Sequence, residues 1–189
     1  MTSRLAAGAR RVLLAAARSA IECKLAGRAY VPPEAPAEVR AACGAFVTLR
    51  NRQSGELRGC IGFVEADDAL LETVARAAVA AATNDLRFHA VALDELPHLR
   101  IEVSVLSPLV PIRPEDVEVG THGLCLRSGR RAGLLLPQVA PEHGWDRDAL
   151  LENLCRKAGV PRATWRQPDA LLLGFTAEVF GEPAPPAPP

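Results

Sequence analysis

The sequence predicts an α+β fold, in which a mixed or antiparallel sheet is flanked by helices. Three segments repeat their apolar residues at helical spacing, and several others alternate with a period of two. The order is helix, hairpin, helix, strands, helix, strand, which is not the regular alternation of a parallel βαβ fold. With 189 residues, of which 49% are hydrophobic, the chain has enough apolar material for a buried core.

The N-terminal part begins with a helix and continues with a β-hairpin. Its predicted elements are a helix over 3–28, strands over 45–50 and 56–65, a helix over 69–83 and a strand over 99–107. The turn of the hairpin is NRQSG (51–55), which ends in glycine. Asp67 or Asp68 is expected to cap the second helix, and Pro108 closes the last strand.

The C-terminal part is predicted to hold short strands around one helix. The elements are a short strand over 110–112, a loop over 113–120, strands over 122–128 and 131–138, a helix over 146–159 and a last strand over 170–180. The helix has Asp146 and Asp148 at its start and Gly159 at its end. Residues 1–182 are therefore predicted to form one domain, followed by a disordered proline-rich tail over 183–189.

Charge and cysteine content exclude several classes of protein. The 22 basic and 22 acidic residues cancel, whereas a dedicated nucleic-acid binder usually carries a basic excess. The longest apolar run, 77–82, is far too short to span a membrane. The five cysteines are odd in number and form no CxxC pair or zinc-type cluster. We therefore expect reduced thiols in a cytoplasmic protein, with no bound metal.

No motif for a resident cofactor is found. The sequence lacks GxxxxGK[ST], GxGxxG after a strand, HExxH and GxSxG, and it has no three-cysteine cluster for an iron–sulfur centre. We therefore expect no cofactor, and the chain does not resemble an ATPase, a dehydrogenase, a zinc protease or a radical enzyme.

The most unusual stretch is LRGCIG (57–62) in the second strand of the hairpin. Alternation places Arg58 and Cys60 on one face, where the cation is expected to favour the thiolate. Gly59 and Gly62 flank the thiol, and glycine within a strand often marks the close approach of a ligand or of another backbone. Cys60 is thus a candidate nucleophile. The alternative is a small buried residue between glycines that permit tight packing.

Other candidate site residues lie outside this hexapeptide. Glu102 and Ser104 share one face of the strand 99–107, where they could line a polar cleft or simply face solvent. Arg87 could line a pocket or belong to a helix end. His122 could act as an acid or a base near neutral pH.

LRGCIG also carries a family resemblance. The chain resembles the AMMECR-type domain, called AmmeMemoRadiSam system protein A in prokaryotes, of which this hexapeptide is the signature. Further matches are spread over about residues 6–181, and Asp85-Leu86-Arg87-Phe88 differs from the family's usual DPRF only at Leu86. The matching segments are AFVTL (45–49), IEVSVLSP (101–108), HGL (122–124), GLLLPQVA (133–140), GWD (144–146) and LCRKAG (154–159).

The resemblance implies an α+β fold with a larger and a smaller lobe around one cleft, near which LRGCIG lies. It also implies two partners, a Memo-type protein and a radical S-adenosylmethionine protein, in a three-part system. It does not imply a reaction or a substrate.

Two functions from different classes remain open. In the first, the chain is an enzyme component in which Cys60 is the nucleophile and Arg58 stabilises its thiolate or binds an anionic substrate group, while Glu102 or His122 moves protons. Gly59, Gly62, Arg87 and Ser104 then belong to the substrate site. In the second, the chain is a binding or adaptor module whose cleft holds a peptide, a small molecule or a partner protein.

Overall fold

The computed structural model describes residues 4–183, and the chain divides into two compact units. Unit 1 comprises Met1–Leu106 and Glu178–Pro189, and unit 2 comprises Ser107–Ala177. Unit 2 is thus continuous in sequence, whereas unit 1 is assembled from both ends of the chain. Within the described range, no helix is both long and apolar enough to cross a membrane.

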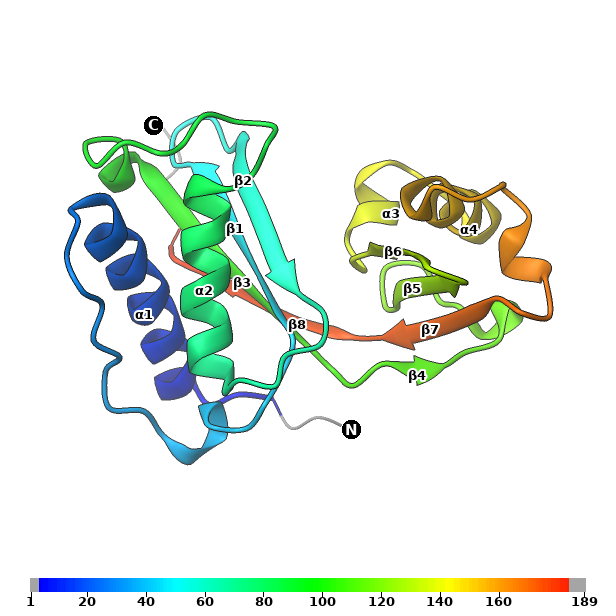
Figure 1. The fold of residues 1–189 in the computed structure, drawn as a ribbon, viewed down its shortest axis with the longest axis horizontal. Helices are drawn as coiled ribbons and strands as arrows, with labels where there is room; N and C mark the ends of the chain where they lie inside the picture. Colours follow the sequence, from blue (N-terminus) through cyan, green and yellow to red (C-terminus); the bar gives the residue numbers. More distant parts are fainter. Residues whose placement is uncertain (1–3, 184–189) are drawn as a thin grey trace. The chain divides into compact units, whose positions relative to one another are not determined.

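Unit 1 is a four-stranded sheet with two helices on one face (Figure 1). The strand order is β2-β1-β3-β8, so β2 and β8 are the edges. The elements are α1 (Ala7–Leu25), a 3-10 turn (Ala37–Val39), β1 (Ala45–Asn51), β2 (Leu57–Phe63), α2 (Leu70–Thr83), a 3-10 turn (Leu96–His98), β3 (Leu99–Leu106) and β8 (Ala177–Gly181). The core lies between the sheet and the helices, which contribute many small alanines.

The hairpin forms as predicted, but the start of α2 differs from the prediction. Gly55 has φ 73° in the turn, and the Asn51 side chain accepts hydrogen bonds from the backbone of Gln53 and Ser54 at 2.8 and 3.0 Å. The N-cap of α2 is Ala69, with no side-chain cap. Asp68 is instead paired with Arg76, about two turns further along the chain, so the predicted capping role of Asp67 or Asp68 is wrong.

Unit 2 is a second four-stranded sheet, in the order β4-β7-β5-β6, with its main helix on one face. Its elements are β4 (Val110–Pro111), a 3-10 turn (Pro114–Asp116), β5 (Gly123–Ser128), β6 (Arg131–Leu135), α3 (Val139–Glu142), α4 (Arg147–Ala158), a 3-10 turn (Thr164–Arg166) and β7 (Leu171–Phe175). Asp146 caps α4 by accepting from the Ala149 backbone at 2.8 Å, and Gly159 ends the helix with φ 70°, as the sequence predicted.

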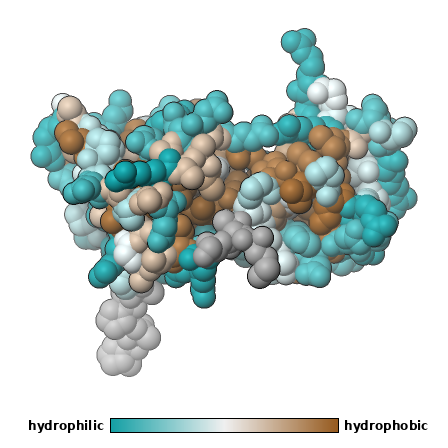
Figure 2. Space-filling model, turned by 90° about the horizontal axis from the view of Figure 1, so that it is seen from below, coloured by the Kyte–Doolittle hydropathy of each residue, from teal (hydrophilic) through white to brown (hydrophobic). Residues whose placement is uncertain are grey.

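Exposed hydrophobic residues lie on the two strands at the β4 side of this second sheet. Val110 on β4 and Leu171 on β7 are exposed hydrophobic residues. Hydrophobic surface is visible over unit 2 in Figure 2.

The last predicted strand, 170–180, is in fact two strands that belong to different sheets. β7 ends at Phe175 in the sheet of unit 2, and β8, which begins at Ala177, belongs to the sheet of unit 1. Between them, the Thr176 carbonyl accepts from the Ser107 amide at 2.8 Å, and the Thr176 amide donates to the Ser107 hydroxyl at 2.9 Å. The first residue of unit 2 and a residue near its end are therefore hydrogen-bonded to each other. Of the predicted tail, residues 184–189 lie outside the described residues.

Candidate functional site

Cys60 lies on the edge strand β2, on the sheet face that points away from α1 and α2. Its register partner on β1 is Thr48, which in turn pairs with Glu102 on β3. The next row on that face holds Gly62, Phe46 and Ser104. We call the face defined by Thr48, Cys60, Glu102 and Ser104 the Cys60 face. The sheet thus places the predicted site residues Cys60 and Gly62 of β2 on the same face as Glu102 and Ser104 of β3.

The Cys60 thiol is half-buried and hydrogen-bonded. The Thr48 hydroxyl donates to Cys60 Sγ at 3.2 Å, and Thr48 itself is only 4% exposed. Burial raises the pKa of Cys60, because a thiolate loses its hydration there. The hydrogen bond from Thr48 and the positive charge of Arg87 lower the pKa, but by less than burial raises it. Cys60 is therefore a protonated thiol at neutral pH.

Arg58 does not activate this thiol, contrary to the expectation from sequence. Its Nε and Nη2 donate to the two carboxylate oxygens of Glu95 at 2.6 and 3.0 Å, and its Nη1 donates to the His89 carbonyl at 2.9 Å. A bidentate carboxylate neutralises the guanidinium and fixes its direction. The inference that Arg58 favours the thiolate was therefore wrong.

Asp85 and Arg87 hold the backbone of Cys60 instead. Asp85 Oδ2 accepts from the Cys60 amide at 2.8 Å, which satisfies an outward-facing N–H of this edge strand. Arg87 binds both oxygens of Asp85, at 2.9 and 2.7 Å, and these bonds hold the pKa of Asp85 well below its usual range. Leu86 is fully exposed, so this departure from DPRF leaves the contacts intact.

The two glycines of LRGCIG are explained by packing within unit 1. A Cβ on Gly59 would lie 2.2 Å from the Ala81 carbonyl oxygen of α2, and one on Gly62 would lie 2.2 Å from the Phe46 ring. They also face opposite sides of the strand, since Gly59 points to α2 and Gly62 lies on the Cys60 face. The close approaches at these glycines come from the protein itself, so they give no evidence of a ligand.

Ser104 is the polar group of this face that lacks a partner. The residue is 1% exposed, and its Oγ has no hydrogen-bond partner within residues 4–183. Nearby, Glu102 faces the guanidinium of Arg100 at 3.5 Å. A buried hydroxyl without a partner costs about 1–3 kcal/mol, so an unsatisfied one in a native fold calls for an explanation.

His122 belongs to unit 2 and has a local structural contact. Its Nδ1 accepts from the Glu118 backbone at 3.1 Å, which closes the turn before β5. The prediction that His122 moves protons for Cys60 stays a prediction. The described part of the chain contains no group of three or more His, Cys, Asp or Glu residues that could hold a metal ion.

Two residues of the site, Thr48 and Glu95, were not identified from the sequence. Thr48 could have been found by counting back from the hairpin turn, although a register shift at Leu49/Arg50 obscures the count. Glu95 gave no signal, because it lies in an irregular segment 37 positions from Arg58.

Comparison with known proteins supports the resemblance over nearly the whole chain. The family model described as AMMECR1 matches residues 14–180. A protein of Thermococcus gammatolerans is 43% identical over 187 residues, covering 93% of this chain and 91% of that protein. One from Methanopyrus kandleri is 44% identical over 153 residues, covering 77% and 74%.

A solved structure has the same fold. The crystal structure of an uncharacterised protein from Pyrococcus horikoshii matches with a TM-score of 0.86 and 41% identity, covering 93% of this chain and 92% of that one. Its description assigns no activity.

Proposed function

Because the chain belongs to the AMMECR1 family, we propose that it is the binding component of a cytoplasmic three-part system, with a Memo-type protein and a radical S-adenosylmethionine protein as partners. In this proposal the Cys60 face is the binding surface. The observation that carries it is the half-buried thiol of Cys60 beside the half-buried carboxylate of Glu102, which the sheet register places on one face.

The chemistry of the Cys60 face favours binding over catalysis. An activated cysteine needs a nearby cation or base that stabilises its thiolate. Here Arg58 is bound to Glu95, and burial raises the pKa of Cys60. The half-buried Cys60 thiol and Glu102 carboxylate can instead form hydrogen bonds with a polar partner.

The test is direct association of the purified full chain with each partner, measured by isothermal titration calorimetry. Glu102→Gln is expected to weaken binding about tenfold, as the loss of a central interface contact does. The matched control is Glu152→Gln on α4, because Glu152 also faces an arginine, Arg162, at 3.5 Å. Absence of binding to both partners, or equal effects of Glu102→Gln and Glu152→Gln, would overturn the proposal.

A thiol-dependent reaction is a second candidate, favoured by the hydrogen bond from Thr48 to Cys60 Sγ. Such a bond stabilises the thiolate once a substrate or partner changes the surroundings of the thiol. If Cys60→Ser retains full affinity for both partners while the assembled system loses its activity, this candidate replaces simple binding. Cys23→Ser, at another half-buried thiol, is the control.

A further inference from the structure

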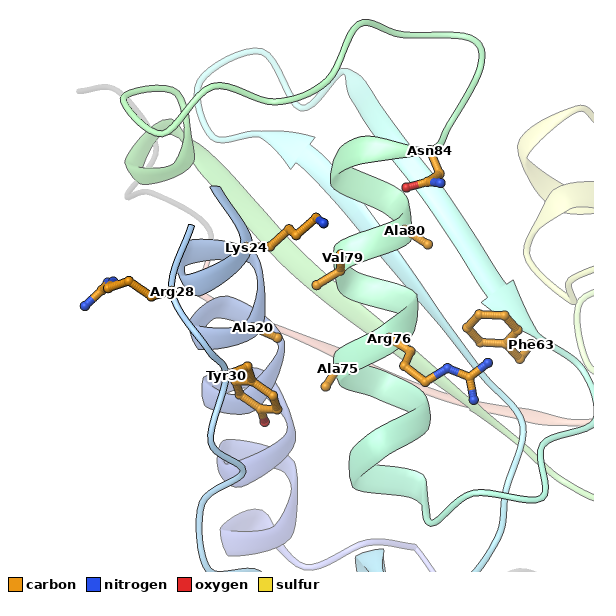
Figure 3. A pocket seen from close by; sticks show the side chains of 10 residues that line it. All are labelled: Ala20, Lys24, Arg28, Tyr30, Phe63, Ala75, Arg76, Val79, Ala80 and Asn84. Atoms are coloured by element: carbon orange, nitrogen blue, oxygen red, sulfur yellow. The ribbon is translucent and has the colours of Figure 1, made fainter. Parts of the chain in front are cut away.

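A hollow of about 450 Å³ lies on the helical side of unit 1, across the outer surface of α2. Figure 3 shows Lys24 and Tyr30 on the α1 side of α2, and Phe63 and Arg76 on its other side. The hollow contains no residue of the Cys60 face. Its volume falls within the range of small-molecule sites, which is roughly 300–1,000 Å³.

Small residues create this hollow. Ala75, Val79 and Ala80 of α2 and Ala20 of α1 line it, so no long side chain fills the space above the two helices. Ala75 is buried, while Val79 and Ala80 are half-buried at the surface of the hollow. The result is a smooth apolar floor that suits a flat apolar group.

Aromatic rings border this floor on both sides. Phe63, at the end of β2, lies under the guanidinium of Arg76 at 4.7 Å from its ring centroid. On the other side is Tyr30, whose hydroxyl is buried and has no hydrogen-bond partner among residues 4–183. Burial and the nearby Glu72 raise the pKa of Tyr30, so the hydroxyl stays protonated and can donate.

The charged residues that line the hollow are all basic. Lys24, Arg28 and Arg76 line it, and none of the lining residues is acidic. Arg28 is paired with Glu22 at 2.9 Å and points away from α2 in Figure 3, while Arg76 is paired with Asp68. Lys24 makes no ion pair in the described part of the chain, and its side chain extends toward α2. Its ammonium is therefore the group that an anion would meet.

We propose that this hollow binds a small molecule with a flat apolar body and one carboxylate or phosphate group. The apolar body lies on the alanines and Val79 between Tyr30 and Phe63, and the anion pairs with Lys24. Charge complementarity selects this class, because a neutral aromatic compound would use the floor but not the ammonium. The inference is independent of the Cys60 face and of the partner proteins.

The single tyrosine of the chain provides the measurement. Full-length protein containing 3-fluorotyrosine gives one ¹⁹F resonance, which reports on position 30. It is titrated in mildly acidic buffer with 2-naphthoate, with 2-naphthyl phosphate and with neutral 2-naphthamide. We expect the resonance to shift with saturation, and at least one anion to bind about fivefold more tightly than the amide, the upper range for an exposed ion pair. Comparison of the two anions shows which group the hollow accepts.

Two variants and one control make the result decisive. Lys24→Gln is expected to remove the preference for the anion, whereas Lys157→Gln, at the other lysine of the chain, is expected to preserve it. Ala80→Leu fills part of the floor and is expected to weaken all three probes. A resonance unmoved by about 5 mM of either anion, equal affinity for anion and amide, or an unchanged preference in Lys24→Gln would each overturn the proposal.

Discussion

Each of the two sheets has an edge strand with a glycine packed closely against a helix, but the residues on the other face of each sheet differ. β2 and β6 are both edge strands, and each has a glycine that faces a helix. A Cβ on Gly59 would lie 2.2 Å from the Ala81 carbonyl oxygen of α2, and one on Gly133 would lie 2.5 Å from the Ala158 amide nitrogen of α4. Since both units have such a glycine, the glycine of the hexapeptide reflects helix packing more than chemistry.

The two sheets differ in the neighbours of the cysteine that lies on the face away from the helix. Cys60 pairs across the sheet with Thr48, next to Glu102. Cys125 on β5 has Leu134 and Leu173 as its register neighbours. One thiol therefore lies in a polar row and the other in an apolar row. The comparison teaches that the row of neighbours, more than the cysteine itself, marks a candidate site.

The largest effect is expected from Gly59→Ala. The new methyl group would meet backbone, which cannot move aside without separating α2 from β2, so unfolding is expected to require about 3 kcal/mol less free energy. Urea unfolding followed by circular dichroism measures this. Gly8→Ala in α1 is the control, because it has open space around it and is expected to stabilise the helix by about 0.5–1 kcal/mol. Equal stability of both variants would contradict the packing role of Gly59.

Gly133→Ala tests the same glycine–helix packing in unit 2. It is expected to lower the free energy of unfolding by less, about 1–2 kcal/mol. Ala158 is the last residue of α4, so its backbone can shift more easily than the helix interior at Ala81. Both tryptophans, Trp145 and Trp165, lie in unit 2, so their fluorescence follows its unfolding. A loss of unfolding free energy larger than that of Gly59→Ala would contradict this difference between the two units.

Asp85→Asn sharpens the comparison by removing a contact that supports β2. Asp85 is 8% exposed and accepts the Cys60 amide, so we expect a loss of about 1–2 kcal/mol near neutral pH. The folded-state pKa of Asp85 lies below its unfolded value of about 3.9, so its contribution is complete above that pH and disappears as the pH falls further. Stability of the wild type should therefore decline more steeply below about pH 4 than that of the variant. Parallel pH profiles would contradict this role.

The smallest effect concerns the reactivity of the thiol. Burial raises the pKa of Cys60, so the midpoint of its alkylation rate against pH is expected above about 8.5, the ordinary thiol value. Thr48→Val removes the hydrogen bond that opposes this rise, and the midpoint should then move higher still. Peptide-resolved iodoacetamide labelling measures Cys60 separately from the other cysteines. A midpoint below about 7 would restore Cys60 as an activated nucleophile.

Much of the fold was predictable, because periodicity and end signals agreed. The hairpin around NRQSG and the helix between Asp146 and Gly159 are confirmed. The division of 170–180 into β7 and β8 was not predictable, since the apolar pattern continues through it and no proline or positive-φ glycine marks Thr176. Only the assignment of the two halves to different sheets reveals the break.

The site was predictable along each strand but not between distant segments. Alternation placed Arg58 with Cys60, and Glu102 with Ser104, on shared faces, and the sheet register joins these faces. The effect of Arg58 on the thiol could not be predicted, because its neutralising partner Glu95 comes from an irregular segment. A pKa inferred from neighbours in sequence was wrong because a neighbour in space cancelled the charge.

The connectivity of the last strand determines the order in which the molecule can be completed during synthesis. β8 follows all of unit 2 in sequence, yet it is the strand beside β3 in the first sheet. Its neighbour Glu182 accepts hydrogen bonds from Arg18 of α1, from Arg52 and from the Ile101 amide. A ribosome therefore releases the whole of unit 2 before the chain contains the strand that completes the sheet of unit 1. Until then the free edge of β3 is exposed, and the newly made chain is at its most vulnerable to pairing with another copy.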